Sequence, residues 1–294
     1  MTGFSSFYRS LLAAWCCAIA SAAPAATSPT VTLTPSVVEA GSPELIRVVA
    51  PRGATLQGEW LGHKLEFFRG PADGAQFALA GVDVEAPTGP SRLEIELTAG
   101  SARIDLSQSV LIEPAHYRTS TLTVAPRYVA PGTAALRRIA AEKQLKASLF
   151  TKSAPERLWR GSFQAPVRAA STDSFGTRRI FDGKLASIHK GLDFRARPGT
   201  PVVADNAGIV VLARPLYYEG SCVILDHGMG LFTISMHLSR IRVREGQRVQ
   251  KGQLLGLSGA TGRVTGPHLH WAVRWEDAYL DPAKLLQLQL GALQ

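Results

Sequence analysis

Apolar and polar residues alternate in short segments over the first third of the chain. These segments are residues 31–34, 45–49, 76–79, 92–97 and 102–106. Alternation with a period of two places the apolar side chains on one face of a strand. Gly, Pro and Asp residues separate the segments, as is typical of turns between strands. The pattern therefore predicts a β-sandwich domain of immunoglobulin-like architecture over residues 27–115.

The connection at residues 116–160 has a different pattern. Residues 134–150 have a helix-forming composition, and Glu142 precedes Lys146 by four positions, which predicts a stabilising ion pair. One face of this helix is expected to carry Leu136, Ile139, Ala140, Lys143 and Leu149. We expect a linker helix that packs on one of the two flanking domains.

Short strands with turns marked by glycine return after residue 161. We expect strands at residues 199–204, 208–212, 221–226, 231–237, 246–257 and 269–275. Residues 227–230 join two of them in a hairpin, and helix is expected only at residues 282–290. The predicted fold class is mainly all-β, with an antiparallel β-domain at residues 161–284 and a C-terminal tail at residues 285–294.

The N-terminal segment and the cysteines indicate export. Residues 1–25 combine Arg9, an apolar run and small residues near the end, which is typical of a secretory signal peptide. Lipid attachment at Cys16 or Cys17 fits less well, because the preceding Trp15 is bulky. Removal of this segment leaves Cys222 alone, so we expect no internal disulfide and a buried thiol.

Composition limits the classes of partner. Among the 294 residues, 46% are hydrophobic, which is ordinary for a globular protein, and no apolar run after the N-terminus is long enough to span a membrane. The formal net charge is +9, which favours anionic surfaces such as cell-wall polymers. The basic residues are spread along the chain rather than concentrated, so we expect no nucleic-acid partner.

Five of the seven histidines lie between residues 189 and 270, and four of them belong to three short motifs. His268 and His270 are two apart on the strand expected at 269–275 and its approach, so their side chains lie on the same face. Gly191 separates His189 from Asp193, which favours a loop that enters a strand over a helix. Two imidazoles and a carboxylate are ligands suited to Zn²⁺, and three protein ligands are typical of a catalytic zinc site.

These motifs resemble those of the lysostaphin/LytM-type zinc metallopeptidases. The resemblance covers about residues 163–282 and consists of His-x3-Asp, His-Leu-Ser and His-x-His, together with flanking sequence at 174–178, 243–253 and 259–262. The resemblance implies that His189, Asp193 and His270 bind one zinc ion per chain. It also implies that His237 and His268 are catalytic, and the sequence does not decide which of the two is the base. No position of the pattern is missing, unlike in relatives that have lost the metal.

The resemblance implies a peptidoglycan hydrolase. We expect a zinc metalloendopeptidase that cuts peptide cross-links of bacterial peptidoglycan, with D-Ala-type cross-links favoured, in the periplasm or, as second choice, secreted. The alternative is a non-catalytic scaffold that binds the wall and activates another wall hydrolase. A regulatory protein is a further candidate partner.

Two other histidines and the sequence ahead of the motifs allow further expectations. His63 is expected to be an inert surface residue, and His227 to stabilise the predicted hairpin turn rather than to bind metal. The linker or the sandwich could cover the zinc cleft until a partner displaces it. A truncation that begins near Gly161 tests this cover hypothesis, which fails if the shortened chain is no more active.

Overall fold

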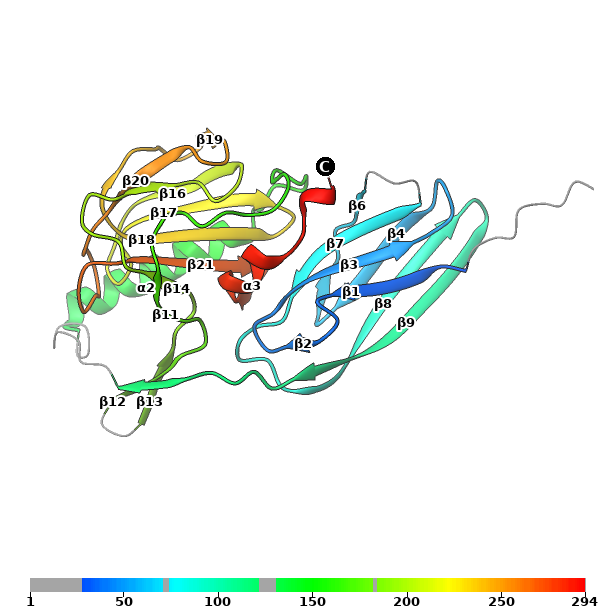
Figure 1. Cartoon of the computed structure of the whole chain (residues 1–294), viewed down its shortest axis with the longest axis horizontal. Helices are drawn as coiled ribbons and strands as arrows, with labels where there is room; N and C mark the ends of the chain where they lie inside the picture. Colours follow the sequence, from blue (N-terminus) through cyan, green and yellow to red (C-terminus); the bar gives the residue numbers. More distant parts are fainter. Residues whose placement is uncertain (1–27, 71–73, 122–130, 182–183, 294) are drawn as a thin grey trace, which may run out of the picture.

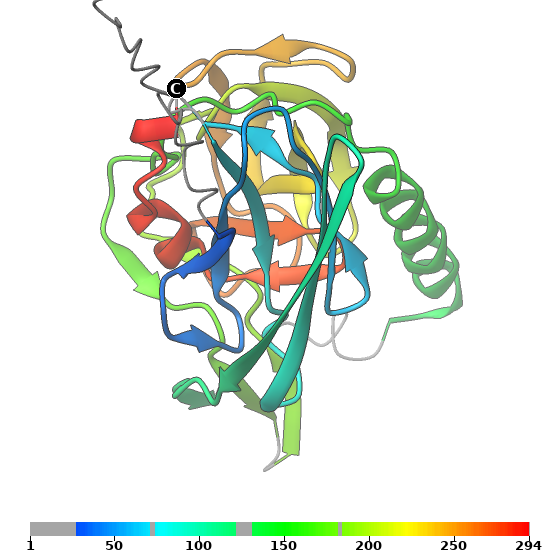
Figure 2. The same ribbon diagram turned by 90° about the vertical axis from the view of Figure 1, so that its right-hand side faces the viewer.

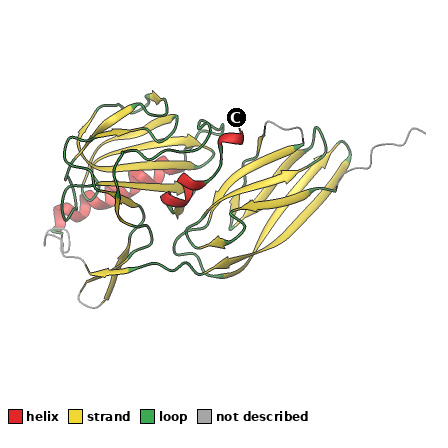
Figure 3. Ribbon diagram, viewed as in Figure 1, coloured by secondary structure: helices red, strands yellow, loops and turns green. Residues whose placement is uncertain are grey.

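The computed structural model describes residues 28–293 except 71–73, 122–130 and 182–183. The signal-peptide prediction for residues 1–25 therefore lies outside the described residues. Strands form most of the regular structure (Figure 3), which confirms the mainly-β prediction. No helix in the described part of the chain is both long enough and apolar enough to cross a membrane.

The N-terminal domain is a sandwich of two sheets, as predicted (Figure 1). One sheet has the order β1 (Thr30–Thr34), β3 (Pro43–Val49), β7 (Ala75–Gly81) and β6 (Phe68–Arg69). The other has the order β2 (Val38–Glu39), β9 (Ala102–Glu113), β8 (Gly89–Ala99), β4 (Thr55–Trp60) and β5 (His63–Lys64). Ile46, Trp60 and Leu93 are fully buried, because the inward positions of each strand are apolar.

The C-terminal domain is built on one antiparallel sheet of ten strands. Its main path is β11 (Ser171–Asp173), β14 (Leu192–Phe194), β21 (Leu269–Trp275), β18 (Leu231–Ile241), β17 (Gly220–Gly228), β16 (Gly208–Leu216) and β19 (Arg248–Val249). The strands β15 (Pro201–Val203), β20 (Leu254–Ser258) and β22 (Ala278–Leu280) pair at the side of this path. The predicted hairpin is β17 and β18, and each predicted strand of this domain has a counterpart.

The two faces of strand β21 have different surroundings. Trp271 and Trp275 point to one face and are buried in the large apolar core. His270 and Ala272 point to the other face, and Ala272 belongs to a second apolar cluster that includes Phe150 of the linker helix. The linker helix therefore packs on the same face of the sheet that carries His270.

The linker helix α2 spans Thr133–Phe150, as predicted, and lies along the outside of the C-terminal sheet (Figure 2). The predicted buried face is wrong in part. Leu136 is 53% exposed, and the contacts with the sheet come from Leu145, Leu149 and Phe150. The Phe150 ring lies 5.1 Å from the ring of Phe232. The apolar residues of this helix are too evenly spread for sequence periodicity to identify the buried face.

The predicted ion pair within α2 is also wrong. Glu142 pairs instead with Arg138, at 2.6 Å, and accepts a hydrogen bond from the Tyr217 backbone N–H at 2.7 Å. Lys146 pairs with Glu219, which lies in the turn between β16 and β17. Tertiary partners in this turn replace the local pair, and they attach the helix to the segment before β17.

A small third sheet joins the connection to the C-terminal domain. Strand β10 (Thr119–Thr121) pairs in parallel with β12 (Arg178–Phe181), and β12 pairs antiparallel with β13 (Lys184–Ile188). This sheet projects below the C-terminal sheet in Figure 1. Strand β10, which follows the sandwich, thus pairs with the β12–β13 hairpin that leads to His189.

The two domains are in close contact. The backbone N–H of Asp281 donates to the Gly41 carbonyl at 2.7 Å, and that of Tyr279 donates to an Asp83 carboxylate oxygen at 2.7 Å. A Cβ added at Gly81 would lie 2.4 Å from the Leu280 side chain, so the domains approach as closely as a glycine allows. His63, which was expected to be inert, lies 2.8 Å from Asp277 at the same boundary, so its contact is a structural one between the domains.

The short helix α3 (Pro282–Gln287) adds to this boundary. Its first turn is capped by Asp281, whose side chain accepts a hydrogen bond from the Ala283 N–H at 2.9 Å. Lys284 of this helix pairs with Glu39 of the sandwich at 2.5 Å. The helix predicted at 282–290 is confirmed, but it ends at Gln287.

Candidate metal centre

Three of the predicted site residues bring their ligand atoms together. His189 Nε2 lies 3.1 Å from Asp193 Oδ1 and 3.0 Å from His270 Nδ1, and His270 Nδ1 lies 2.8 Å from Asp193 Oδ1. Pairing between β14 and β21 sets Asp193 directly opposite His270 in the sheet. Residues that are 77 and 81 positions apart in sequence are therefore neighbours because their strands are paired.

The surroundings of His189 determine which of its nitrogens faces the other ligands. Nδ1 lies 2.9 Å from the Ser174 carbonyl oxygen, which can only accept, so Nδ1 carries the proton. Nε2 is then left with a lone pair directed at Asp193 and His270. A fixed tautomer of this kind is the usual state of a metal-binding histidine.

Gly191 makes room for the His270 ring. A Cβ at this position would lie 2.4 Å from His270 Nε2 and 2.8 Å from the Trp271 carbonyl oxygen, closer than real Cβ contacts. The glycine is therefore needed for its small size, and its spacing between His189 and Asp193 has a steric cause. The predicted loop entering a strand is confirmed, because β14 begins at Leu192.

The charges of the ligand group favour cation binding. Burial by itself raises the pKa of the Asp193 carboxyl, but the adjoining imidazole rings of His189 and His270 outweigh burial and hold the pKa below its usual range. Burial lowers the pKa of His270, and the neighbouring Asp193 carboxylate offsets part of this shift. Near neutral pH the group thus offers an ionised carboxylate beside an imidazole that resists protonation.

His237 adjoins the ligand group from β18. The sequence predicted that His237 ends this strand, but the residue lies inside it. At this position the partner of β18 changes from β21 to β20. Its φ of 64° is in the left-handed region that non-glycine residues seldom occupy, and such strain occurs often at functional sites. Its Nδ1 lies 2.8 Å from the Thr261 carbonyl oxygen, so Nε2 is the free acceptor.

His268 is held in the same manner. Its Nδ1 lies 2.8 Å from the Gly266 carbonyl oxygen, and its Nε2 lies 3.7 Å from Asp193 Oδ1. The rings of His237 and His268 are 4.9 Å apart between centroids. Burial lowers the pKa of His237 to about 3, so this ring stays neutral at ordinary pH. Both histidines thus present a proton acceptor next to the three ligand atoms.

The donor set fits a zinc ion. One carboxylate oxygen and two imidazole nitrogens lie within 4.8 Å of one another, and these are the ligand types and the number found in catalytic zinc sites. Three acceptor atoms in contact repel one another unless protons or a cation lie between them. A divalent cation satisfies all three at once, whereas the Ser174 carbonyl already holds the ring proton of His189.

Two residues near the motifs have structural roles. His227 is completely buried, with Nδ1 at 2.8 Å from the Ala207 carbonyl oxygen and Nε2 at 2.8 Å from the Thr233 hydroxyl. It therefore stabilises the fold rather than the metal centre, as predicted. Cys222 is buried in the cluster beneath α2, and burial raises the pKa of its thiol, which makes it unreactive.

The sequence did not identify two charged residues that surround the ligands. Asp173 Oδ2 lies 3.3 Å from His189 Nδ1, and Arg179 Nη2 lies 3.6 Å from Asp193 Oδ2. Both flank the motif at 174–178, but no spacing rule connects them to the ligands. Their proximity arises from the pairing of β11 with β14 and of β12 with β13.

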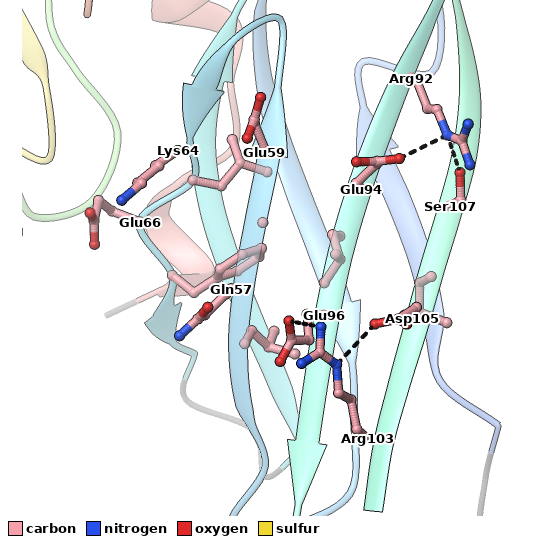
Figure 4. Close-up of a pocket in the computed structure, with 16 residues that line it drawn as sticks. Gln57, Glu59, Lys64, Glu66, Arg92, Glu94, Glu96, Arg103, Asp105 and Ser107 are labelled. Carbon is pink, nitrogen blue, oxygen red and sulfur yellow. Dashed lines mark hydrogen bonds and ion pairs between the residues drawn. The ribbon is translucent and has the colours of Figure 1, made fainter.

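A cavity of about 840 Å³ lies elsewhere, on the outer face of the five-stranded sheet (Figure 4). Charged side chains line it, and several are already paired. Arg92 lies 2.9 Å from Glu94, and Arg103 lies 2.6 Å from Glu96. The cavity contains none of the site histidines, so we place the chemistry at the metal centre.

An antiparallel sheet that brings a carboxylate and four histidines to one point is an arrangement suited to a metallopeptidase. The comparison with protein families identifies the particular one: residues 187–282 match the model of Peptidase family M23. The chain therefore carries an M23 peptidase domain, and this finding confirms the resemblance noted from the motifs.

Relatives and a solved structure agree with this assignment. The chain is 46% identical over 101 residues to the peptidoglycan DD-endopeptidase ShyA of Vibrio cholerae. The matched segment covers 34% of this chain and 24% of ShyA. It is 41% identical over 120 residues to an uncharacterized metalloprotease of Haemophilus influenzae. This matched segment covers 40% of this chain and 25% of that protein. The matched part thus spans about a quarter of these relatives.

A crystal structure of a peptidase M23 protein from Pseudomonas aeruginosa resembles the chain over both domains. The TM-score is 0.64 at 28% identity, with 87% of this chain and 96% of that chain covered. The sandwich and the M23 domain therefore occur together in another protein of similar size.

Proposed function

We propose that this chain is a zinc-dependent endopeptidase that hydrolyses peptide cross-links of bacterial peptidoglycan. The observation that carries the proposal is the convergence of His189 Nε2, Asp193 Oδ1 and His270 Nδ1 beside two further histidines. The M23 domain and the DD-endopeptidase name of ShyA support peptidoglycan as the substrate, with D-alanyl cross-links preferred. We propose a periplasmic location on the basis of the signal sequence expected at residues 1–25.

His189, Asp193 and His270 would hold the zinc ion. When bound there, zinc supplies Lewis acidity toward a carbonyl oxygen and a water molecule. Ser174 keeps His189 in the tautomer that offers Nε2, and Gly191 leaves the space for the His270 ring. The chain thereby fixes the ligand atoms before the metal binds.

His237 and His268 would move the protons. Their Nδ1–H groups are held by the carbonyls of Thr261 and Gly266, so each ring can only accept a proton at Nε2. One ring accepts the proton of the attacking water at Nε2. A ring that is protonated at Nε2 then donates this proton to the leaving amine or a hydrogen bond to the developing oxyanion. A neutral ring is required for the first step, and burial keeps His237 neutral.

Incubation of purified sacculi with the full chain, followed by chromatography and mass spectrometry of the released fragments, tests the proposal. We expect cross-linked dimers to be converted to monomers, and the fragment masses identify the bond that is cut. Treatment with a chelator should abolish the conversion, and added zinc should restore it. The His270→Ala variant is the matched inactive control.

Two outcomes would contradict the proposal. Conversion that persists after the metal is removed would exclude a metal-dependent reaction. Binding of sacculi without any conversion, by a zinc-loaded chain, would instead support the alternative of a wall-binding scaffold that activates another hydrolase.

A further inference from the structure

Charged groups surround the metal centre on the side of β11. Asp173 Oδ2 lies 3.3 Å from Nδ1 of the candidate ligand His189. Arg179 Nη2 lies 3.1 Å from this same Asp173 oxygen and 3.6 Å from Oδ2 of the candidate ligand Asp193. One guanidinium is therefore shared between a carboxylate that faces the metal position and a carboxylate that does not.

The fold fixes this arrangement. The pairing of β11 with β14 sets Asp173 opposite Asp193, and Arg179 projects from the neighbouring hairpin. The Thr177 hydroxyl, which is buried, donates to Asp173 Oδ1 at 2.9 Å and holds the carboxylate in place. Asp173 and Arg179 are each about three-quarters covered, with side-chain exposures of 25% and 21%, so water screens their charges only in part.

Neither charge is needed to orient a ligand. The Ser174 carbonyl already fixes the His189 ring at 2.9 Å, whereas Asp173 is farther from the same nitrogen. Likewise, His189 and His270 hold Asp193 Oδ1, and the 3.6 Å between Arg179 and Asp193 Oδ2 exceeds a hydrogen bond. Both residues must therefore act on the centre mainly through their charge.

We propose that Asp173 and Arg179 set the metal affinity of the centre in opposite directions through their charges. Asp173 strengthens cation binding because its carboxylate makes the His189 imidazole a better electron donor. Arg179 weakens cation binding because its positive charge lies beside the ligand Asp193 and partly neutralises it. The inference rests on the proposed function, since it concerns the same zinc site.

The test is the zinc affinity of the full chain, measured at fixed pH and ionic strength by competition with a chromophoric chelator. We expect Asp173→Asn, which removes a negative charge at constant shape, to weaken zinc binding about tenfold. We expect Arg179→Gln to strengthen it by about three- to tenfold. Arg179→Lys keeps the charge and should leave the affinity near that of the unmodified chain.

A matched control is available outside the centre. Asp277 also pairs with a histidine, His63, at 2.8 Å, but this pair lies at the domain boundary. Asp277→Asn should therefore leave the zinc affinity unchanged. Asp173→Ser and Arg179→Met remove the same two charges with other side-chain shapes, and the same opposite shifts are expected if either first variant folds poorly.

The opposite signs separate charge from structure. A purely structural role for the pair predicts weaker zinc binding in both variants, and that result, or no change in either, would overturn the inference. Thermal melting with and without zinc gives a readout that does not depend on turnover. Relative to the unmodified chain, Arg179→Gln should lose more stability in the metal-free state than in the zinc-bound state. If the unmodified chain itself binds no zinc, the proposed function fails as well, whereas zinc binding with shifts of equal sign overturns only this inference.

Discussion

Three of the four histidines of the centre are oriented by a backbone carbonyl that holds the Nδ1 nitrogen of the ring. Ser174, Thr261 and Gly266 each accept the Nδ1–H of one ring, so three imidazoles direct Nε2 toward the same place. His270 differs, because its Nδ1 faces the ligand group and its Nε2 side lies against Gly191. The orientation of the four rings therefore depends on backbone contacts that no motif describes.

Substitution of the two histidines of the last motif should separate binding from turnover. His270→Ala removes a ligand atom and should abolish both zinc binding and the cleavage of cross-links. His268→Ala leaves the three ligand atoms in place and should retain zinc but lower turnover at least about a hundredfold, as for loss of a general acid or base. Metal content and fragment release, measured on the same preparation, check both; loss of zinc in His268→Ala would assign that ring to the ligand set.

Glu44 should make the stability depend on pH. The residue is fully buried, and burial raises its pKa to about 8, partly opposed by the hydrogen bond from Ser42. The folded chain then binds a proton that the unfolded chain releases above its ordinary value of about 4.5, so stability falls as pH rises from 4.5 to 8. The slope contributed is at most about 1.4 kcal/mol per pH unit.

Glu44→Gln should remove that dependence. We expect the variant to melt at a higher temperature than the unmodified chain at pH 8 and at a similar temperature at pH 4.5. Thermal denaturation across this range measures the difference. A difference of equal size at both ends would show that the carboxyl does not titrate within it.

Among the elements, helix α2 depends on its last turn for attachment. Phe150 is buried against Phe232, and the Arg274 guanidinium lies 4.4 Å from the centre of the Phe150 ring. Phe150→Ala should therefore lower the free energy of unfolding by about 3–5 kcal/mol, as for other buried aromatic side chains. Leu136→Ala is the matched control on the exposed face and should change it by less than about 0.5 kcal/mol.

Chemical denaturation of both variants checks this assignment. Equal losses would mean that Leu136 is also buried, as the sequence pattern had indicated. The prediction from the sequence failed here because the apolar residues of α2 do not form a single stripe. Contacts with the sheet select Leu145, Leu149 and Phe150, and these contacts are not encoded by helical periodicity.

The strands were predicted better than the contacts between elements. Period-two alternation identified the sandwich and the hairpin of β17 and β18, because their inward positions are consistently apolar. Strand β10 and its parallel pairing with β12 were not predicted, since Thr119–Thr121 is short and polar. The candidate ligand residues were predicted from motifs, whereas Asp173 and Arg179 were not, because their proximity to the site depends on strand pairing.

At the scale of the molecule, the two domains are in direct contact, and we expect them to unfold as one cooperative unit. The Asp281 N–H donates to the Gly41 carbonyl, the Tyr279 N–H donates to the Asp83 carboxylate, and the Leu280 side chain packs on Gly81. Lys190, which follows the ligand His189, also pairs with Glu85 of the sandwich at 2.5 Å. Separation of the domains would expose these groups, so independent unfolding is unfavourable.

Differential scanning calorimetry should therefore show a single transition for the sandwich and the M23 domain. Zinc should raise its midpoint, because a ligand that binds only the folded state stabilises every part that unfolds with it. A second transition that zinc does not shift would show that the sandwich unfolds independently.

The parallel pairing of β10 with β12 has a practical consequence for the design of fusion proteins that contain the M23 domain. A graft that starts at Gly161 would lack both the strand next to Arg179 and the helix that covers Cys222 and Phe232. A change in its activity could then come from the loss of these two elements as well as from exposure of the zinc cleft. Such a truncation therefore does not test the cover hypothesis by itself. A transplant that begins at about residue 117 retains both, together with Tyr117, whose ring lies 5.8 Å from that of Phe175.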